Sequence, residues 1–119
     1  MTTQHIADRV VALSRQGKSK EAYEELFADH AVAIEMEHPD NPNPRTEGKA
    51  ALLKKNDQFD TIMEEVHEMI VSDPIVTDKY FTVSMLLDAT FQGRGRTREE
   101  EICLYKVEDG KIVSEQFFY

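Results

Sequence analysis

Residues 101–119 read Glu-Ile-Cys-Leu-Tyr-Lys-Val-Glu-Asp-Gly-Lys-Ile-Val-Ser-Glu-Gln-Phe-Phe-Tyr, and this stretch decides the fold. Asp109-Gly110 separates two runs that are rich in β-branched and aromatic residues. An Asp-Gly pair between two such runs is a strong short-range signal for a β-hairpin with a two-residue turn. The stretch therefore predicts the last two strands of a sheet, at residues 98–108 and 111–119.

The alternation of side chains along this hairpin indicates a cavity wall. Successive residues of a strand point to opposite faces of a sheet, so every second residue shares a face. Here one face combines a thiol, aromatic rings and a carboxylate, which suits the wall of a pocket better than a plain core. Its members are Cys103, Tyr105 and Val107 on the first strand and Val113, Glu115, Phe117 and Tyr119 on the second.

Length and charge bound the class of protein. A chain of 119 residues is typical of one domain, here residues 1–119. The net charge of −9 argues against nucleic acid, because phosphate binding needs a concentrated basic surface. The one basic cluster, Arg94, Arg96 and Arg98, is followed at once by acidic residues 99–101, which indicates a turn with local charge compensation. We expect no nucleic-acid partner.

The sequence also predicts a cytoplasmic protein without a membrane partner. No apolar run reaches the roughly eighteen residues that a membrane span requires. The N-terminal residues lack the charged-then-apolar layout of a secretory signal. Cys103 is the only cysteine, so no internal disulfide can form, which fits a reducing compartment.

Apolar residues at helical spacing predict three helices in the first half of the chain. The first covers residues 4–15 and is ended by Gly17. Ser19 is placed to cap a second helix through its hydroxyl, and this helix is predicted to bury Ala22, Tyr23, Leu26 and Phe27. The third helix covers residues 47–63.

The second half of the chain reads as strands. Helices followed by a meander of long strands predict an α+β fold, in which the helices cover one face of an antiparallel sheet. The predicted strands are residues 31–37, 66–72, 79–91, 98–108 and 111–119, with a stiff proline-rich loop at residues 38–44.

Three short sequence motifs occur along the chain in the same order as in one known superfamily. In order and spacing, over nearly the whole chain, they resemble the nuclear-transport-factor-2-like superfamily, and within it the SnoaL-like proteins. The motifs are Leu26-Phe-Ala-Asp-His-Ala31 after two short predicted helices, Glu47-Gly-Lys-Ala-Ala51 at the start of the third, and Tyr105-Lys-Val-Glu-Asp-Gly-Lys-Ile-Val113 in the hairpin.

This resemblance implies an α+β cone with a pocket at its open end. Three N-terminal helices would pack in the concave face of a strongly curved, mixed or antiparallel sheet. It also implies a homodimer that pairs through the outer face of that sheet. The superfamily includes ketosteroid isomerases, polyketide cyclases, epoxide hydrolases, dehydratases and members without catalysis, so the fold alone does not name the function.

The known chemistries of the superfamily match this sequence only in part. By the resemblance, the isomerase base corresponds to Glu37 or His38, and an acidic donor corresponds to Cys103. A thiol is a weak donor, so the sequence departs from the isomerase pattern. The epoxide-hydrolase pattern needs an Arg-x-Asp pair, of which only Asp88 is present. We interpret Asp88 as an outward, solvated or interfacial carboxylate, because burying an unpaired carboxylate is costly.

Glu115 is the carboxylate that the residues themselves single out. If its face is interior, burial among aromatic rings raises its pKa and makes it a general acid or base. The alternative is a place near the rim, or a structural hydrogen bond to Tyr105. His67 shares a predicted face with Met69 and is a candidate proton shuttle, although a satisfied core or rim histidine is the commoner case.

The leading hypothesis is a pocket that binds a small, largely apolar molecule, with acid/base chemistry of the isomerase or cyclase type. The alternative is a non-catalytic binding domain or a dimeric interaction domain. No histidine cluster predicts a metal site, and we expect no cofactor. The candidate catalytic residues are Glu115, His67, Glu37 and His38. The candidate ligand-binding residues are Phe27, Phe59, Met63, Met69, Glu101, Cys103, Tyr105, Phe117 and Tyr119.

Overall fold

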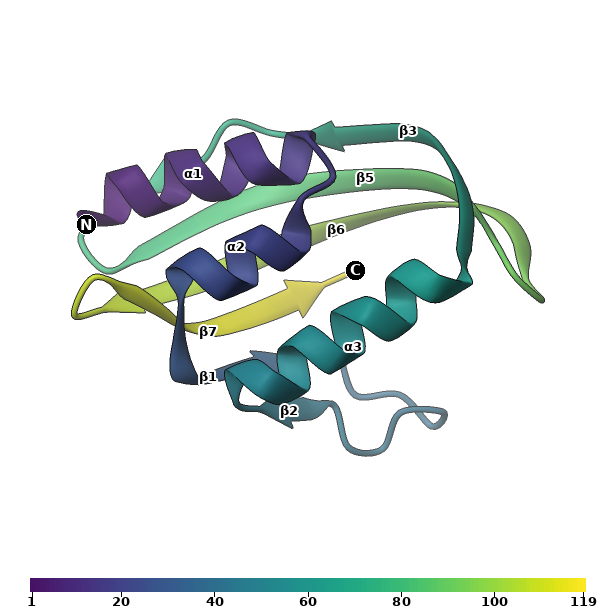
Figure 1. The fold of residues 1–119 in the computed structure, drawn as a ribbon, viewed down its shortest axis with the longest axis horizontal. Helices are drawn as coiled ribbons and strands as arrows, with labels where there is room; N and C mark the ends of the chain where they lie inside the picture. The colour runs from purple at the N-terminus through teal and green to yellow at the C-terminus, as the bar shows by residue number, and fades with distance from the viewer.

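One curved sheet and three helices make up the computed structural model, which describes residues 1–119 (Figure 1). The strands follow the order β2-β1-β7-β6-β5-β3, with β4 paired to β5 at the side. All neighbouring strands are antiparallel except β1 and β7, which are parallel, so the sheet is mixed. The strands are β1 (Phe27–Ile34), β2 (Arg45–Glu47), β3 (Met63–Val71), β4 (Ile75–Val76), β5 (Tyr80–Phe91), β6 (Gly95–Glu108) and β7 (Lys111–Phe118).

The three helices lie on the same side of this sheet (Figure 1). They are α1 (Thr3–Arg15), α2 (Ser19–Leu26) and α3 (Lys49–Ile62). α1 packs over β3, β4 and β5, whereas α3 lies against β1 and β2 and also reaches β3. This arrangement confirms the predicted α+β fold with helices in the concave face of a sheet. None of the helices is both long and apolar enough to cross a membrane.

The junction between α1 and α2 follows the prediction at Gly17 and departs from it at Ser19. Gly17 has a φ of 71°, and its amide and that of Lys18 donate to the carbonyls of Ser14 and Leu13. These bonds form a glycine-terminated helix end, as predicted. The predicted cap at Ser19 is wrong: Lys18 precedes the helix without a side-chain cap. The Ser19 hydroxyl instead donates to Asn56 Oδ1 on α3 at 3.0 Å.

The terminal hairpin forms at the predicted turn. Asp109 and Gly110 have φ angles of 51° and 73°, so both central residues occupy the left-handed region that a two-residue hairpin turn requires. The pairing of β6 with β7 sets Tyr105 directly opposite Glu115 and Cys103 opposite Phe117. The hairpin register therefore brings the mixed polar and aromatic residues together on one face.

The predicted strand boundaries fail where tertiary pairing replaces local propensity. β1 begins at Phe27, a residue that was predicted to lie in the second helix. It stops at Ile34, before the predicted end at residue 37. β2 and β4 were not predicted. Each is very short and is held by pairing to a neighbouring strand, β1 and β5 respectively. A strand of two or three residues is too short for its alternation of apolar and polar residues to be recognised in the sequence.

A β-bulge in β3 sets which of its side chains face the helices. Val66 pairs with Ala89, but Glu68 pairs with Asp88, so His67 is an extra residue between two ladder positions. A bulge leaves its extra residue unpaired and reverses the alternation of faces beyond it. The residue spacing alone does not reveal such an insertion.

The hydrophobic core lies between α1, α2 and the middle of the sheet. It is built from fully buried aliphatic side chains and from a stacked pair, Phe81 and Tyr105, whose ring centroids are 4.6 Å apart. Burial of each large apolar side chain stabilises the fold by about 1.5–3 kcal/mol. The largest fully buried side chains are Phe81, Ile6, Leu13, Leu26, Ile112, Val83 and Cys103.

The hairpin turn provides a first test of this fold. Gly110→Ala places a methyl group at a positive φ and 3.2 Å from the backbone nitrogen of Met1. We expect the free energy of unfolding to fall by about 1–2 kcal/mol, measured by urea denaturation. Gly93→Ala is the matched control, because Gly93 also has a positive φ, of 81°, but faces open space. An equal loss in the two variants would contradict a role for the contact with Met1.

Candidate functional site

A cavity of about 1120 Å³ lies between the helices and the concave face of the sheet. α1, α2 and α3 line one side of the cavity, and the inner face of β1, β3, β5, β6 and β7 lines the other. Its wall is largely apolar, which suits an apolar molecule of drug-like size. The apolar lining includes Phe27, Leu52, Phe59, Met63, Met69, Met85, Leu87 and Phe117.

Glu115 is the buried carboxylate of this cavity. Its side chain comes from β7, and the residue is 4% exposed. The hydroxyl of Tyr23, on α2, donates to Glu115 Oε1 at 2.8 Å. Burial raises the pKa of Glu115 to about 7, and hydrogen bonding from Tyr23 and then Tyr105 opposes this rise. Glu115 therefore changes charge near neutral pH.

Two phenols beside Glu115 are neutral donors. Burial, and next the charge of Glu115, raise the pKa of Tyr23 and of Tyr105 well above the ordinary value for tyrosine. Both hydroxyls consequently keep their protons across the physiological range. Tyr105 is fixed by its place opposite Glu115 in the hairpin and by stacking on Phe81. The pair can donate hydrogen bonds to an anionic oxygen but cannot act as bases there.

Further carboxylates line the cavity near Glu115. Burial, and then the charge of Glu35, raise the pKa of Glu101. Glu35, which follows β1, accepts hydrogen bonds at 3.2 Å from the Tyr119 hydroxyl and from Lys55 Nζ. The interior of the cavity thus carries negative charge, and Lys55 is the one cation in contact with these acids.

Cys103 belongs to the core. It is 0% exposed, does not line the cavity, and its thiol donates weakly to Glu101 Oε1 at 3.7 Å. Burial, followed by the charge of Glu101, raises the pKa of the thiol far above its ordinary value. A thiol that keeps its proton is a poor nucleophile. The expectation of Cys103 as a ligand contact is therefore wrong, because packing covers it.

The other predicted pocket residues lie where the sequence placed them. Their contact with a ligand remains a prediction, but their side chains all border the cavity. The list comprises Phe27, Phe59, Met63, Met69, Glu101, Tyr105, Glu115, Phe117 and Tyr119.

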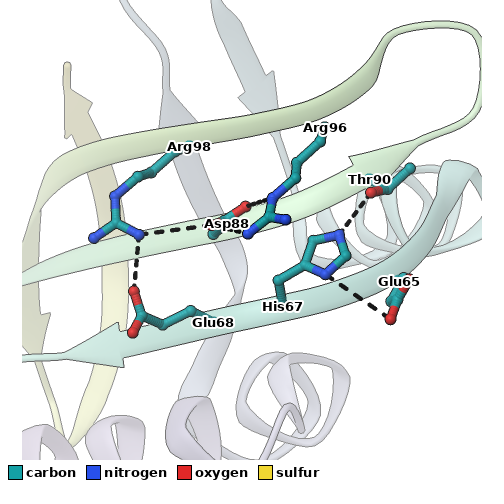
Figure 2. Close-up of polar contacts among 7 residues, drawn as sticks. All are labelled: Glu65, His67, Glu68, Asp88, Thr90, Arg96 and Arg98. Atoms are coloured by element: carbon teal, nitrogen blue, oxygen red, sulfur yellow. Dashed lines mark hydrogen bonds and ion pairs between the residues drawn. The ribbon is translucent and has the colours of Figure 1, made fainter.

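His67 lies on the outer face of the sheet, which corrects the expectation of a catalytic histidine in the pocket. The bulge in β3 turns it away from Met69, and its Nε2 atom is 2.7 Å from Thr90 Oγ1 (Figure 2). Its Nδ1 atom is 3.8 Å from a carboxylate oxygen of Glu65. His67 does not border the cavity and cannot exchange a proton with a ligand there.

Asp88 also lies on the outer face, within an ion-pair network. Arg96 binds both of its carboxylate oxygens, at 2.9 and 3.0 Å, and Arg98 bridges Asp88 and Glu68 at 3.6 and 2.9 Å (Figure 2). The hydrogen bond from Arg96 lowers the pKa of Asp88. Asp88 points outward, as predicted, but it is covered by the arginines and is not solvated: its side chain is 7% exposed. Two of the three arginines of the basic cluster are thus neutralised by carboxylates on neighbouring strands.

Glu37 and His38 lie in the exposed segment that follows β1, away from the cavity lining. The ring of His38 accepts a hydrogen bond from the amide of Asp40 at 3.1 Å, which holds a local turn. β1 ends earlier than predicted, so these residues are not carried along the sheet into the interior. The expectation that either serves as the base is corrected.

Sequence reasoning missed Tyr23, Glu35, Lys55 and Asn56 as residues of the site. Tyr23 was recognised only as a buried residue of the second helix. Asn56 accepts from Ser19, but its own amide nitrogen is buried without a partner. A polar side chain on an otherwise apolar helix stripe was the available signal for Asn56, because buried polar groups need partners. No group of three or more potential ligands is arranged to hold a metal ion.

Comparison with known proteins identifies the family. The family model for the SnoaL-like domain matches residues 1–119, the whole chain. The chain belongs to the SnoaL-like domain family. A search of curated proteins finds no match.

Solved structures resemble this member of the SnoaL-like family closely. A Mesorhizobium loti protein, provisionally named a SnoaL-like polyketide cyclase or carbohydrate phosphatase, shares 34% identity over 100% of both chains, with a TM-score of 0.90. A provisionally named SnoaL-like polyketide cyclase from Jannaschia shares the fold at 13% identity, a TM-score of 0.76 and coverage of 99% and 86%. A Catenulispora acidiphila protein with a ketosteroid-isomerase-like fold, solved with trimethylamine, has 16% sequence identity and a TM-score of 0.74. The match covers 99% of this chain and 87% of the Catenulispora chain.

The raised pKa of Glu115 makes the stability of this SnoaL-like fold depend on pH. The folded-state pKa of about 7 exceeds the ordinary value of 4.5, so the folded state binds this proton more tightly than the unfolded state. The contribution is fully present below pH 4.5 and is lost as pH rises to about 7. At about 1.4 kcal/mol per pKa unit, the loss is about 3 kcal/mol.

Glu115→Gln tests this linkage. At about pH 8 the variant should be more stable than the native chain by up to about 3 kcal/mol, because it buries no charge, and near pH 4 the difference should vanish. Urea denaturation across this pH range measures the effect. Glu64→Gln, the same change at an exposed position of β3, should leave the pH profile as it is. Destabilisation of Glu115→Gln at every pH would instead identify a structural pair.

Proposed function

We propose that this SnoaL-like protein binds a small, largely apolar molecule in the cavity and that Glu115 moves a proton to or from it. One observation carries the proposal: the carboxyl group of Glu115, with a pKa of about 7, is part of the wall of a largely apolar cavity. A general base is most effective when its pKa is near the working pH. An ordinary exposed glutamate would be too weak a base for this task.

The proposed step is abstraction of a proton from carbon next to a carbonyl group. The C–H bond breaks, the proton passes to a Glu115 oxygen, and the electron pair moves into the carbonyl oxygen. Return of the proton from Glu115 to another carbon of the enolate completes an isomerisation. In a cyclisation the enolate carbon attacks a second carbonyl carbon, the π electron pair of that carbonyl moves to its oxygen, and the proton on Glu115 passes to this oxygen. The hydroxyls of Tyr23 and Tyr105 donate to Glu115 while it is ionised; once Glu115 has taken the proton, they are the neutral donors that can turn to the enolate oxygen, a kind of stabilisation that lowers such barriers.

The comparisons support the proposal at the level of the family. The Mesorhizobium protein is provisionally named a polyketide cyclase, with carbohydrate phosphatase as a second label, and the first of these reactions needs carbanion chemistry of this type. The Catenulispora protein holds trimethylamine, so that chain accommodates a small organic molecule. Neither name identifies a substrate for this chain.

Deuterium exchange measures the proposed proton transfer without the natural substrate. A β,γ-unsaturated cyclic ketone, incubated with the protein in deuterium oxide, should exchange its acidic hydrogen, as followed by nuclear magnetic resonance. Glu115→Gln should slow this exchange by about 10²–10⁴-fold. The native rate should rise with pH and level off above about 7, as Glu115 ionises.

Tyr23→Phe distinguishes a catalytic carboxylate from a structural one. The Tyr23 hydroxyl lowers the pKa of Glu115, so its removal should shift the midpoint of the rate profile to higher pH. A merely structural Tyr23 would change the amount of folded protein and leave the midpoint in place. Exchange that is equally fast with Glu115→Gln would rule out Glu115 as the base, leaving a non-catalytic ligand-binding domain.

The outer face of the sheet favours a second proposal, a homodimer. Ile70, Ile102 and Phe118 are 51%, 53% and 43% exposed, and the register places Ile102 beside Phe118 on the face that the helices leave open. Apolar groups gathered on an open sheet face favour association. We propose that two copies pair through this face, whether or not the cavity is catalytic.

Ile102→Lys should convert this dimer to a monomer, because the charged side chain would be desolvated at the centre of the interface. Sedimentation velocity at micromolar concentration measures the result. Gln58→Lys adds the same charge at an exposed position of α3 and should leave the dimer intact. A native chain that sediments as a monomer would contradict the proposal.

A further inference from the structure

The charge of the cavity is unbalanced where it is most enclosed. Glu115 and Glu101 line the cavity, and neither has an ion-pair partner. Lys55 is already paired with Glu35 at 3.2 Å, and its side chain is 45% exposed. The other two cations of the lining are also engaged: Arg15 with the carbonyl of Val71 and with Asp73, and Arg94 over the ring of Phe91.

A buried carboxylate without a cationic partner is the feature that calls for a ligand. Buried charges in proteins are generally paired, because desolvation of an unpaired charge is costly. Glu115 is 4% exposed, and the hydrogen bond that it accepts comes from a neutral phenol. A positive group on the bound molecule would supply the missing partner.

Aromatic rings line the cavity together with Glu115. The rings of Tyr23 and Phe27 have centroids 4.6 Å apart, and Phe27 meets Tyr105 edge-on at 6.4 Å. Phe117 borders the cavity from the strand of Glu115. Ring faces attract cations by their quadrupole, most strongly where water is excluded. The rings and the carboxylate therefore select for the same kind of chemical group.

We infer that the ligand of this cavity is a cation, a small apolar molecule that carries one ammonium group, bound with that group beside Glu115 and the aromatic rings. This inference rests on the proposed function, since it names the ligand class of the same site. The apolar remainder of the molecule lies against the wall of Leu52, Met85 and Leu87. An anionic ligand is disfavoured, because Glu35 and Glu101 would repel it.

Binding of a cation should be linked to the proton on Glu115. The titratable groups that face Glu115 are Tyr23 from α2, Tyr105, Cys103 and Glu101 from β6, and Glu35 after β1. All are neutral or negative at neutral pH or below, so none competes with the ligand as a positive partner. A permanent cation should bind more tightly as pH rises through about 7, and should release a proton on binding at that pH.

Three probes of one shape and different charge test the inference. Phenyltrimethylammonium is the cation, tert-butylbenzene is its uncharged isostere, and benzenesulfonate is a tetrahedral anion. Titrations of the native chain are followed by amide chemical shifts at about pH 6 and pH 8. At the higher pH we expect the cation to bind at least about tenfold more tightly than the neutral isostere and the anion to bind most weakly. Lowering the pH should weaken the cation alone.

Two variants locate the effect. Glu115→Gln should remove the pH dependence and reduce the preference for the cation to a few-fold or less. Leu87→Trp should fill the cavity and weaken all probes, whereas Leu53→Trp, the same change outside the lining on α3, should weaken none. Equal or tighter binding of the neutral isostere or of the anion would overturn the cationic ligand and leave the apolar pocket standing. Failure of every probe to bind would overturn both.

Discussion

The hydrogen bond between the Tyr23 hydroxyl and Glu115 is the interaction on which the interior of this protein depends. It joins α2 to β7 at 2.8 Å, across the space between the helical layer and the sheet. The bond holds a carboxylate where apolar packing would otherwise favour a hydrocarbon. Burial raises the pKa of the group, and the phenol prevents a larger rise. The chemistry of the cavity follows from this balance.

The sheet supports this interaction through its register. Tyr105 is opposite Glu115 because the Asp-Gly turn, together with a register shift between Lys106 and Val107, sets the pairing of β6 with β7. A slip of one residue would move Glu115 to the outer face and replace it by a neighbouring side chain. The parallel pairing of β1 with β7 then brings β1 alongside, with Ala33 aligned with Glu115. The acidic side of the cavity thus depends on two strand pairings, one local and one distant.

Local signals predicted most of the elements but only part of the site. The hairpin, the end of α1 at Gly17 and the long strands each carry their own turn residue or periodicity. The faces of β6 and β7 followed from alternation, so Tyr105, Glu115 and Phe117 were assigned correctly to the inner face. His67 was assigned to the wrong face because it is the extra residue of a bulge, and that bulge depends on how β3 pairs with β5. Glu37 and His38 were misplaced because β1 ends at Ile34, the last residue that pairs with β2 and with β7.

By itself, the sequence determined the order of helices and strands, the closing hairpin and the family, because turn geometry and side-chain periodicity act between near neighbours. Only the tertiary structure decided which carboxylates are buried and which side chains surround each of them. Asp88 and Glu115 are both largely covered, yet Asp88 meets two arginines on the outer face and Glu115 meets phenols inside. Their pKa values move in opposite directions. The cause is physical: the charge of a carboxyl group responds to atoms a few ångströms away in space, which the chain brings together from distant positions.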